Sequence, residues 1–139
     1  MKLKLNCLIL LLALDVYSPA LAQVTVEQGR VLYEAKKYAD AEKVLIAIAS
    51  NNTSYAAAQF YLGRIAFDRK NYETAVEFFE RATKVNPTNA EYFFYYGVAS
   101  AEMAKAASIF SKPSWASQSR KAWETASALD SRYIEPRLS

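Results

Sequence analysis

The chain has 139 residues, of which 53% are hydrophobic and 22% are charged, so it has enough apolar content to build one packed domain. Its 17 basic and 14 acidic residues give a net charge of only +3, which provides no electrostatic footprint for nucleic acid, and we expect none to bind. Histidine is absent and Cys7 is the one cysteine, so the commonest catalytic bases, nucleophiles and soft-metal ligands are missing. We therefore predict a protein that is not an enzyme and holds no metal or cofactor.

The first segment has the layout of a secretory signal peptide. Lys2 and Lys4 precede an apolar run over residues 7–14, and a small-residue ending follows at Ala22. The apolar run is far shorter than the roughly 18 to 20 residues that a membrane-spanning helix needs. We predict a signal peptide over residues 1–22 and an exported protein, periplasmic or secreted, with no stable membrane span after cleavage.

Cys7 lies within the part that we expect to be removed, so the mature chain would contain no cysteine. A lipoprotein would require Cys7 to be the acylated residue, but the apolar run follows this cysteine instead of preceding it. Removal of Lys2, Lys4 and Asp15 would leave 15 basic and 13 acidic residues, which is a charge of +2.

The rest of the chain repeats with a period of 34 residues. Gly29, Gly63 and Gly97 are spaced by 34 and 34. The same spacing relates Tyr38 to Tyr72, Ala41 to Ala75, Leu45 to Phe79, and Ile48 to Ala82. A fixed period of this length is the signature of a solenoid of repeated helix pairs.

This pattern resembles the tetratricopeptide repeat, a helix-turn-helix unit of 34 residues. The middle unit matches best, at Leu62, Gly63, Ala75, Phe79, Ala82 and Pro87. The first unit is degenerate, whereas the third retains Trp123 and Ala126. The resemblance implies an all-α, right-handed solenoid of antiparallel helix pairs. We expect it to fill residues 23–139, with repeats at about 23–55, 56–89 and 90–133.

The third unit is longer than the other two. Gly97 and Trp123 are 26 residues apart, whereas Gly63 and Phe79 are 16 apart, so ten residues are inserted. With no helix breaker before Pro113, we expect the first helix to run from about Ala90 to Phe110 and the second from Trp115 to Ala128. This elongated repeat is similar to a group of exported bacterial repeat proteins. The hairpin is either a loop elongation without function or a contact site made by Ile109, Phe110 and Trp115.

Helix boundaries and the aromatic run at 92–96 give further local predictions. Asn86 and Pro87 should end one helix pair, and the segment from Thr88 to Glu91 is typical of a capping box. In the run itself we expect Phe93 and Tyr96 in the core, Phe94 on the concave groove, and Tyr92 and Tyr95 between neighbouring repeats.

In the tetratricopeptide repeat, the first helices line a concave groove that binds partner segments. The resemblance places these groove candidates there: Arg30, Tyr33, Phe60, Arg64, Phe67, Asp68, Glu91, Phe94 and Glu102. Aromatic residues and arginine favour binding, although Arg30 with Glu34, and Arg64 with Asp68, are spaced to pair with each other. The lysine and asparagine with which some members clamp a terminal carboxylate are not matched.

We therefore expect a protein-binding scaffold of the cell envelope with a protein or peptide partner. The alternative is a self-assembling structural subunit, or a shortened relative of a longer repeat protein. The chain stops a few residues into the fourth unit that the period calls for after Ser131. Because each repeat leaves one apolar face for the next, we expect residues of the third pair, among them Tyr95 and Trp123 or their neighbours, to be partly uncovered and available to a second copy, unless the ten-residue insertion folds over them.

Overall fold

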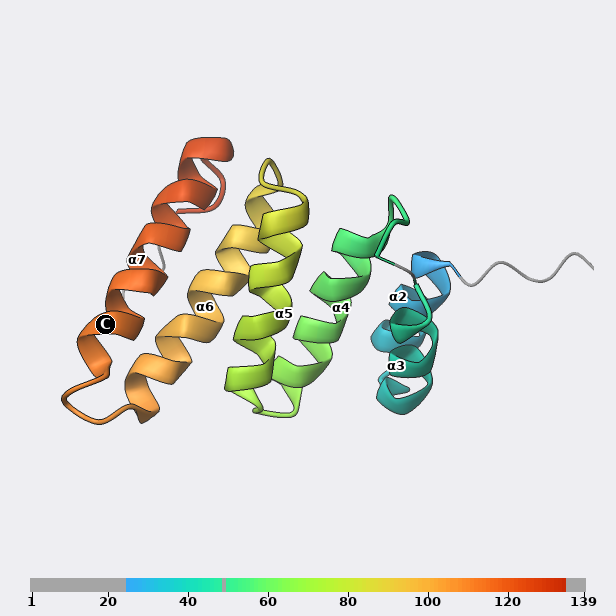
Figure 1. The fold of residues 1–139 in the computed structure, drawn as a ribbon, viewed down its shortest axis with the longest axis horizontal. Coiled ribbons are helices and arrows are strands. Elements are labelled where there is room, and N and C mark those ends of the chain that lie inside the picture. The colour runs from blue at the N-terminus through green and yellow to red at the C-terminus, as the bar shows by residue number, and fades with distance from the viewer. Residues whose placement is uncertain (1–24, 49, 135–139) are drawn as a thin grey trace, which may run out of the picture.

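The computed structural model describes residues 25–48 and 50–134, so the predicted signal peptide lies outside the described residues. These residues form six helices and no strand. The helices are α2 (Val26–Glu34), α3 (Tyr38–Ile46), α4 (Tyr55–Asp68), α5 (Tyr72–Val85), α6 (Ala90–Ala106) and α7 (Lys112–Leu129). Figure 1 shows them as hairpins that follow one another along the molecule in chain order. The predicted all-α solenoid is confirmed. None of the described helices is long and apolar enough to cross a bilayer.

The periodic glycines lie where the two helices of each pair touch. A Cβ atom on Gly63 would come 2.7 Å from ring atoms of Phe79, and one on Gly97 would come 2.5 Å from the indole of Trp123. Real Cβ atoms do not approach so closely, and both aromatic side chains are buried. The period therefore records a packing requirement, since only glycine admits the aromatic side chain of the second helix.

The start of α6 differs by one residue from the predicted capping box. The N-cap is Asn89, whose side chain accepts a hydrogen bond from the Tyr92 amide at 3.3 Å. Thr88 lies outside the helix, and its hydroxyl donates to the Asn86 side chain at 2.9 Å. The prediction of a capping box from Thr88 to Glu91 was therefore wrong, although α6 does begin in this segment.

The elongated hairpin also differs from the prediction. Helix α6 ends at Ala106 instead of Phe110, because Ala107 adopts an extended conformation with ψ at 151°. Helix α7 begins at Lys112, three residues before the expected Trp115, with Pro113 in its first turn. Proline is well placed there because its missing N–H has no partner within the helix in any case.

The inserted residues lengthen both helices of the pair equally. Nine residues follow Gly97 within α6, whereas five follow Gly63 within α4. Eleven residues of α7 precede Trp123, whereas seven of α5 precede Phe79, and the connecting segment has five residues instead of three. Each helix has thus gained four residues, about one turn. Because α6 and α7 are lengthened by the same amount at the hairpin end, Gly97 and Trp123 still meet at the helix crossing.

Much of the core of the described residues lies in two clusters, one centred on α2, α3 and α4 and the other on α4, α5 and α6. Tyr92 is 7% exposed and stacks on Phe60 of the preceding pair at a centroid distance of 4.9 Å. The expectation that Trp123 would be partly uncovered is wrong, because it is 3% exposed. Its indole N–H donates to the Phe94 carbonyl at 3.2 Å, so the third pair covers this residue by itself.

Candidate partner-binding face

Aromatic rings of the first helices α2, α4 and α6 form a line in which neighbouring rings touch, with Tyr38 of α3 at one end and Tyr133 after α7 at the other. We call this line the aromatic ladder. Successive ring centroids lie 5.4 to 5.9 Å apart in the order Tyr38, Tyr33, Tyr61, Phe60, Tyr95, Phe94 and Tyr133. All are half-buried except Phe60. We call the surface built by α2, α4 and α6 along this ladder the first-helix face.

Arg64 lies at the middle of the ladder. Its guanidinium carbon is 4.1 Å from the ring centroid of Tyr95, 5.3 Å from that of Tyr33 and 5.7 Å from that of Phe60. These distances fall within the range of cation–π attraction. The three rings come from α6, α2 and α4, so Arg64 joins all three repeats of the face.

Asp68 accepts hydrogen bonds from two ladder tyrosines. The hydroxyls of Tyr33 and Tyr38 donate to its Oδ2 at 3.1 and 3.0 Å. Burial raises the pKa of Tyr33 to about 12, with Arg64 opposing and Asp68 reinforcing the shift. The alternative that Arg64 and Asp68 pair with each other is not seen among the described ion pairs, because Asp68 is engaged by tyrosines.

Arg30 is paired as its spacing suggested. Its guanidinium contacts the carboxylates of Glu34 and Glu27, the latter at 2.5 Å. These two partners raise the pKa of Arg30, which stays charged at every physiological pH. Arg30 is therefore a charge satisfied within its own helix, with little left to offer a partner.

Two predicted groove residues serve the core instead. Phe60 is 3% exposed and touches rings of Phe79 and Tyr92, so its prediction as partner-binding surface is wrong. The side chain that reaches the surface beside it is Tyr61. Phe67 is half-buried against the core and packs on Tyr72 of α5 at 5.2 Å.

The third pair contributes Phe94, Glu91 and Glu102 to the first-helix face. Phe94 packs against Tyr133 at 5.4 Å, so the segment after α7 folds back onto it. Glu102 forms an ion pair with Lys105 at 2.6 Å. Glu91 is half-buried and has no ion pair or hydrogen bond among the described residues. Phe94 and Glu102 therefore have contacts within the protein, whereas the Glu91 carboxylate has no polar partner among the described residues.

A second candidate surface is the end of the elongated hairpin. Ile109 is 79% exposed and Phe110 is 89% exposed. The turn that carries them is closed by Ser111, whose amide donates to the Ser108 carbonyl at 3.1 Å. Trp115 is different, because it is half-buried and packs against the core. The turn thus presents two large apolar side chains to solvent.

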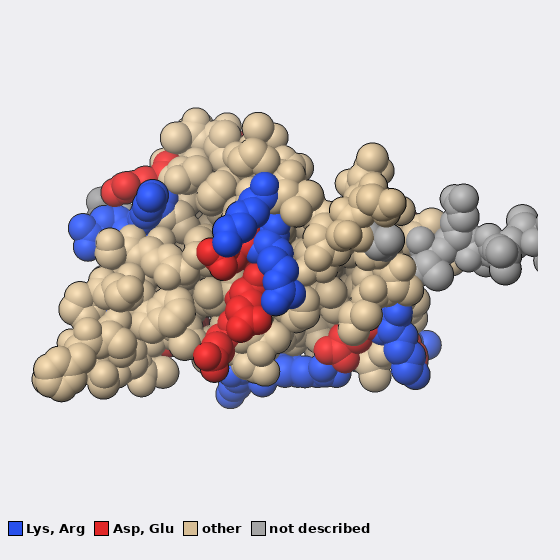
Figure 2. Space-filling model, viewed as in Figure 1, with Lys and Arg blue, Asp and Glu red and all other residues tan. Residues whose placement is uncertain are grey.

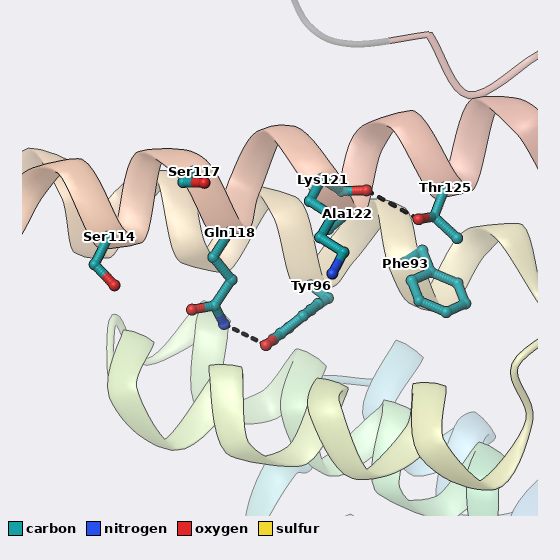
Figure 3. Close-up of a pocket in the computed structure, with 8 residues that line it drawn as sticks. All are labelled: Phe93, Tyr96, Ser114, Ser117, Gln118, Lys121, Ala122 and Thr125. Carbon is teal, nitrogen blue, oxygen red and sulfur yellow. Dashed lines mark hydrogen bonds between the residues drawn. The ribbon is translucent and has the colours of Figure 1, made fainter.

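A cleft of about 460 Å³ is lined by residues of α6 and α7 (Figure 3). Its floor includes Phe93 and Tyr96 of α6, which are only half-buried, so the expectation that both lie in the core holds only in part. Gln118 of α7 donates to the hydroxyl of Tyr96 across the cleft. The remaining lining is polar and comes from Ser114, Ser117, Lys121 and Thr125, with Ala122.

Four ladder tyrosines were not among the predicted site residues, and Tyr38 had been noted only as a member of the 34-residue period. Tyr61 and Tyr133 fall outside the positions that the family resemblance assigns to the groove, and Tyr95 was assigned to packing between repeats. Tyr95 does pack there, against Phe60 and Phe79, while it also supports Arg64. The signal that pointed to Tyr95 was the aromatic run itself, whereas no feature of the sequence marked Tyr133.

Residues 26–90 match the family model of the tetratricopeptide repeat. Comparisons with curated proteins and with solved structures gave no match. The matched segment spans the first two helix pairs and reaches the first residue of α6. Repeats of this family generally mediate protein–protein interaction and are typically not catalytic. The period, the helix pairs and the family match together identify residues 26–90 as tetratricopeptide repeats.

Proposed function

We propose that the chain is a scaffold that binds a segment of a partner protein along the first-helix face. The observation that carries this proposal is the aromatic ladder, which keeps six half-buried rings in contact across all three helix pairs. Tyrosine is enriched at binding hot spots because it offers a large contact area and a polar end at low entropic cost. A long segment lying across the three helices would meet ring after ring.

The opposite surface contrasts with this face. Figure 2 shows a stripe of alternating acidic and basic side chains over α5. The pairs there are Glu77 with Arg81 at 3.2 Å and Glu80 with Lys84 at 3.0 Å, each four residues apart. Such pairs satisfy one another in water and add a few tenths of a kcal/mol to the helix. Binding therefore fits the aromatic face better than the charged one.

We further propose that the scaffold works outside the cytoplasm, in the cell envelope. The layout of residues 1–22 supports this location, since basic, apolar and small-residue regions follow one another in the order of a signal peptide. Intact-mass measurement of the protein recovered from the envelope fraction tests it. A chain beginning at Gln23 is the expected result, and a chain retaining Met1 would contradict export by cleavage.

The binding proposal is tested by selecting a displayed library of random peptides on the purified protein. Affinities of the selected peptides are then measured for Tyr33→Ala and Tyr133→Ala, which remove rings near the two ends of the ladder. We expect each change to weaken binding about tenfold, as for interface hot spots worth 1 kcal/mol or more. Ile134→Ala is the matched control, because Ile134 follows Tyr133 in the chain and is 72% exposed.

Helicity measured by circular dichroism shows that each variant is folded. If folded Tyr33→Ala and Tyr133→Ala bind the selected peptides as well as the unchanged protein, the first-helix face is not the binding surface. If no peptide is selected, the scaffold proposal itself fails.

A second candidate contact is the hairpin end with Ile109 and Phe110. Its carrying observation is that two adjacent large apolar side chains are more than three-quarters exposed on a turn closed by hydrogen bonds. Self-association through this end is tested by light scattering. A dimer that becomes a monomer in Phe110→Ser would support it, and a monomer at high concentration would contradict it.

A further inference from the structure

We propose that the segment bound on the first-helix face is basic and places a lysine or arginine side chain beside Glu91. This inference rests on the scaffold function proposed above and names the chemistry of the partner. It begins from the sign of the charge on the face.

The first-helix face is acidic in a chain that is basic overall. The charged side chains of α2, α4 and α6 are Glu27, Arg30, Glu34, Arg64, Asp68, Glu91, Glu102 and Lys105. Five carboxylates against three cations leave a charge of −2, whereas the whole chain carries +3. A face whose sign opposes that of its own protein attracts a partner segment of positive charge.

Most of these charges are already engaged within the protein. Arg30 is held by two glutamates, and Glu102 pairs with Lys105. Asp68 accepts hydrogen bonds from two tyrosines. Glu91 has no ion pair or hydrogen bond within residues 25–48 and 50–134. It is therefore the carboxylate of the face with the most capacity left for a partner.

Glu91 lies among ladder rings. It precedes Phe94 and Tyr95 by three and four residues on α6, which brings these side chains to one side of the helix. Burial raises the pKa of Tyr133, and the Glu91 carboxylate raises it further. Burial also raises the pKa of Tyr61, where Glu91 again adds to the shift and Arg30 opposes it. On α6 the carboxylate therefore lies on the same side of the helix as the rings of Phe94 and Tyr95.

The ladder already holds one cation. The guanidinium of Arg64 lies 4.1 Å from the centroid of Tyr95, with the ring of Tyr33 at 5.3 Å. Rings that stabilise an internal arginine in this way can stabilise an incoming lysine or arginine by the same attraction. Around Glu91 the rings are combined with a carboxylate. The rings would pack against the aliphatic stem of a bound lysine or arginine, and the carboxylate would pair with its charged head.

A helix N-terminus alone would also favour a glutamate at this position, and α5 provides the comparison. Glu73 and Glu91 are both the second residue of their helices, and each helix is capped by an asparagine that accepts an amide hydrogen bond at 3.3 Å. Glu73 is exposed on α5 and belongs to no aromatic ladder. The two residues share the helix dipole and differ in their surroundings.

The experiment selects a displayed random peptide library on the full protein and compares the selected sequences with the unselected library. Enrichment in lysine and arginine is the expected result. Glu91→Gln should then lower the affinity for the selected peptides about three- to tenfold. Added salt should lower the affinity of the unchanged protein for these peptides more than that of the variant. Glu73→Gln, with the same loss of charge and the same place in its helix, should bind like the unchanged protein.

Selected peptides without enrichment in basic residues would overturn the inference, as would equal affinity of Glu91→Gln and the unchanged protein. In either case, loss of binding in Tyr33→Ala or Tyr133→Ala would still support the scaffold function. Enriched basic peptides that respond equally to Glu73→Gln and Glu91→Gln would also overturn the inference, because the attraction would then follow net charge and not this site.

Discussion

The second and third helix pairs share one crossing and differ at the hairpin end. In both pairs a glycine of the first helix receives an aromatic side chain of the second, Phe79 on Gly63 and Trp123 on Gly97. The connecting turns differ in length, conformation and polarity. The comparison indicates that close packing at the crossing determines how the two helices of a pair lie against each other. At the hairpin end, each helix can lengthen by one turn without disturbing the crossing.

The two turns end their first helices by different means. In the second pair the Asn71 amide donates to the Ala66 carbonyl at 2.9 Å and the Lys70 amide to the Phe67 carbonyl at 2.8 Å, while Lys70 has φ at 61°. This arrangement is a Schellman motif, which satisfies the last carbonyls of α4. In the third pair Ala107 is extended, and the chain departs without a residue at positive φ.

The largest expected effect tests the shared crossing. Gly63→Ala and Gly97→Ala should each lower the free energy of unfolding by about 1 to 3 kcal/mol, because the added methyl group meets a rigid, buried ring. Urea unfolding followed by circular dichroism measures this. At an ordinary helical position the same change would raise stability by about 1 kcal/mol, so an unchanged or raised unfolding midpoint would show that the crossing is not close-packed.

The period and the crossing were predictable from the sequence because each crossing requires a small residue at a fixed position. The end of α6 was not, because alanines at 106 and 107 favour helix equally and the chain turns where the partner helix ends. Pro113 was ambiguous, since a proline can end one helix or open the next. The predicted end of α6 at Phe110 and the predicted start of α7 at Trp115 were therefore both wrong.

Site residues were predictable only as far as helical position determines exposure. Phe60 falls on the predicted groove side, but Tyr92 and Tyr95 from the next pair cover it. Tyr133 lies beyond the last helix, and its return to Phe94 depends on the path of an irregular segment. Contacts between pairs and between distant segments are not encoded in the period of one repeat.

A second difference between the pairs lies four residues before the crossing glycine of each first helix. Gln59 of α4 is 5% exposed, and its Oε1 has no hydrogen-bond partner among the described residues, whereas Phe93 occupies the equivalent place in α6. An unsatisfied buried acceptor costs about 1 to 3 kcal/mol. Gln59→Leu should therefore raise the free energy of unfolding by about 1 kcal/mol. A loss in the same urea experiment would mean that this oxygen is hydrogen-bonded in solution.

A smaller gain is expected at the turn of the second pair. Lys70 adopts a conformation that costs residues other than glycine about 1 to 2 kcal/mol. Lys70→Gly should raise stability by roughly 0.5 to 1 kcal/mol after the entropy of glycine in the unfolded chain is counted. Ser111→Gly, in the turn of the third pair without positive φ, should give no gain. Equal responses of the two variants would contradict the proposed difference between the turns.

The smallest expected effect concerns the end of the elongated hairpin. The double change of Ile109→Ser and Phe110→Ser should leave the free energy of unfolding within about 0.5 kcal/mol, because both side chains are mostly exposed in the folded chain. The backbone hydrogen bonds from Ser111 and Lys112 to the Ser108 carbonyl hold the turn without them. A folded protein of unchanged stability, with less self-association or weaker partner binding, would assign the pair to contact. A clear loss of stability would show that the two side chains pack against the chain itself, and the hairpin end would no longer be a candidate surface.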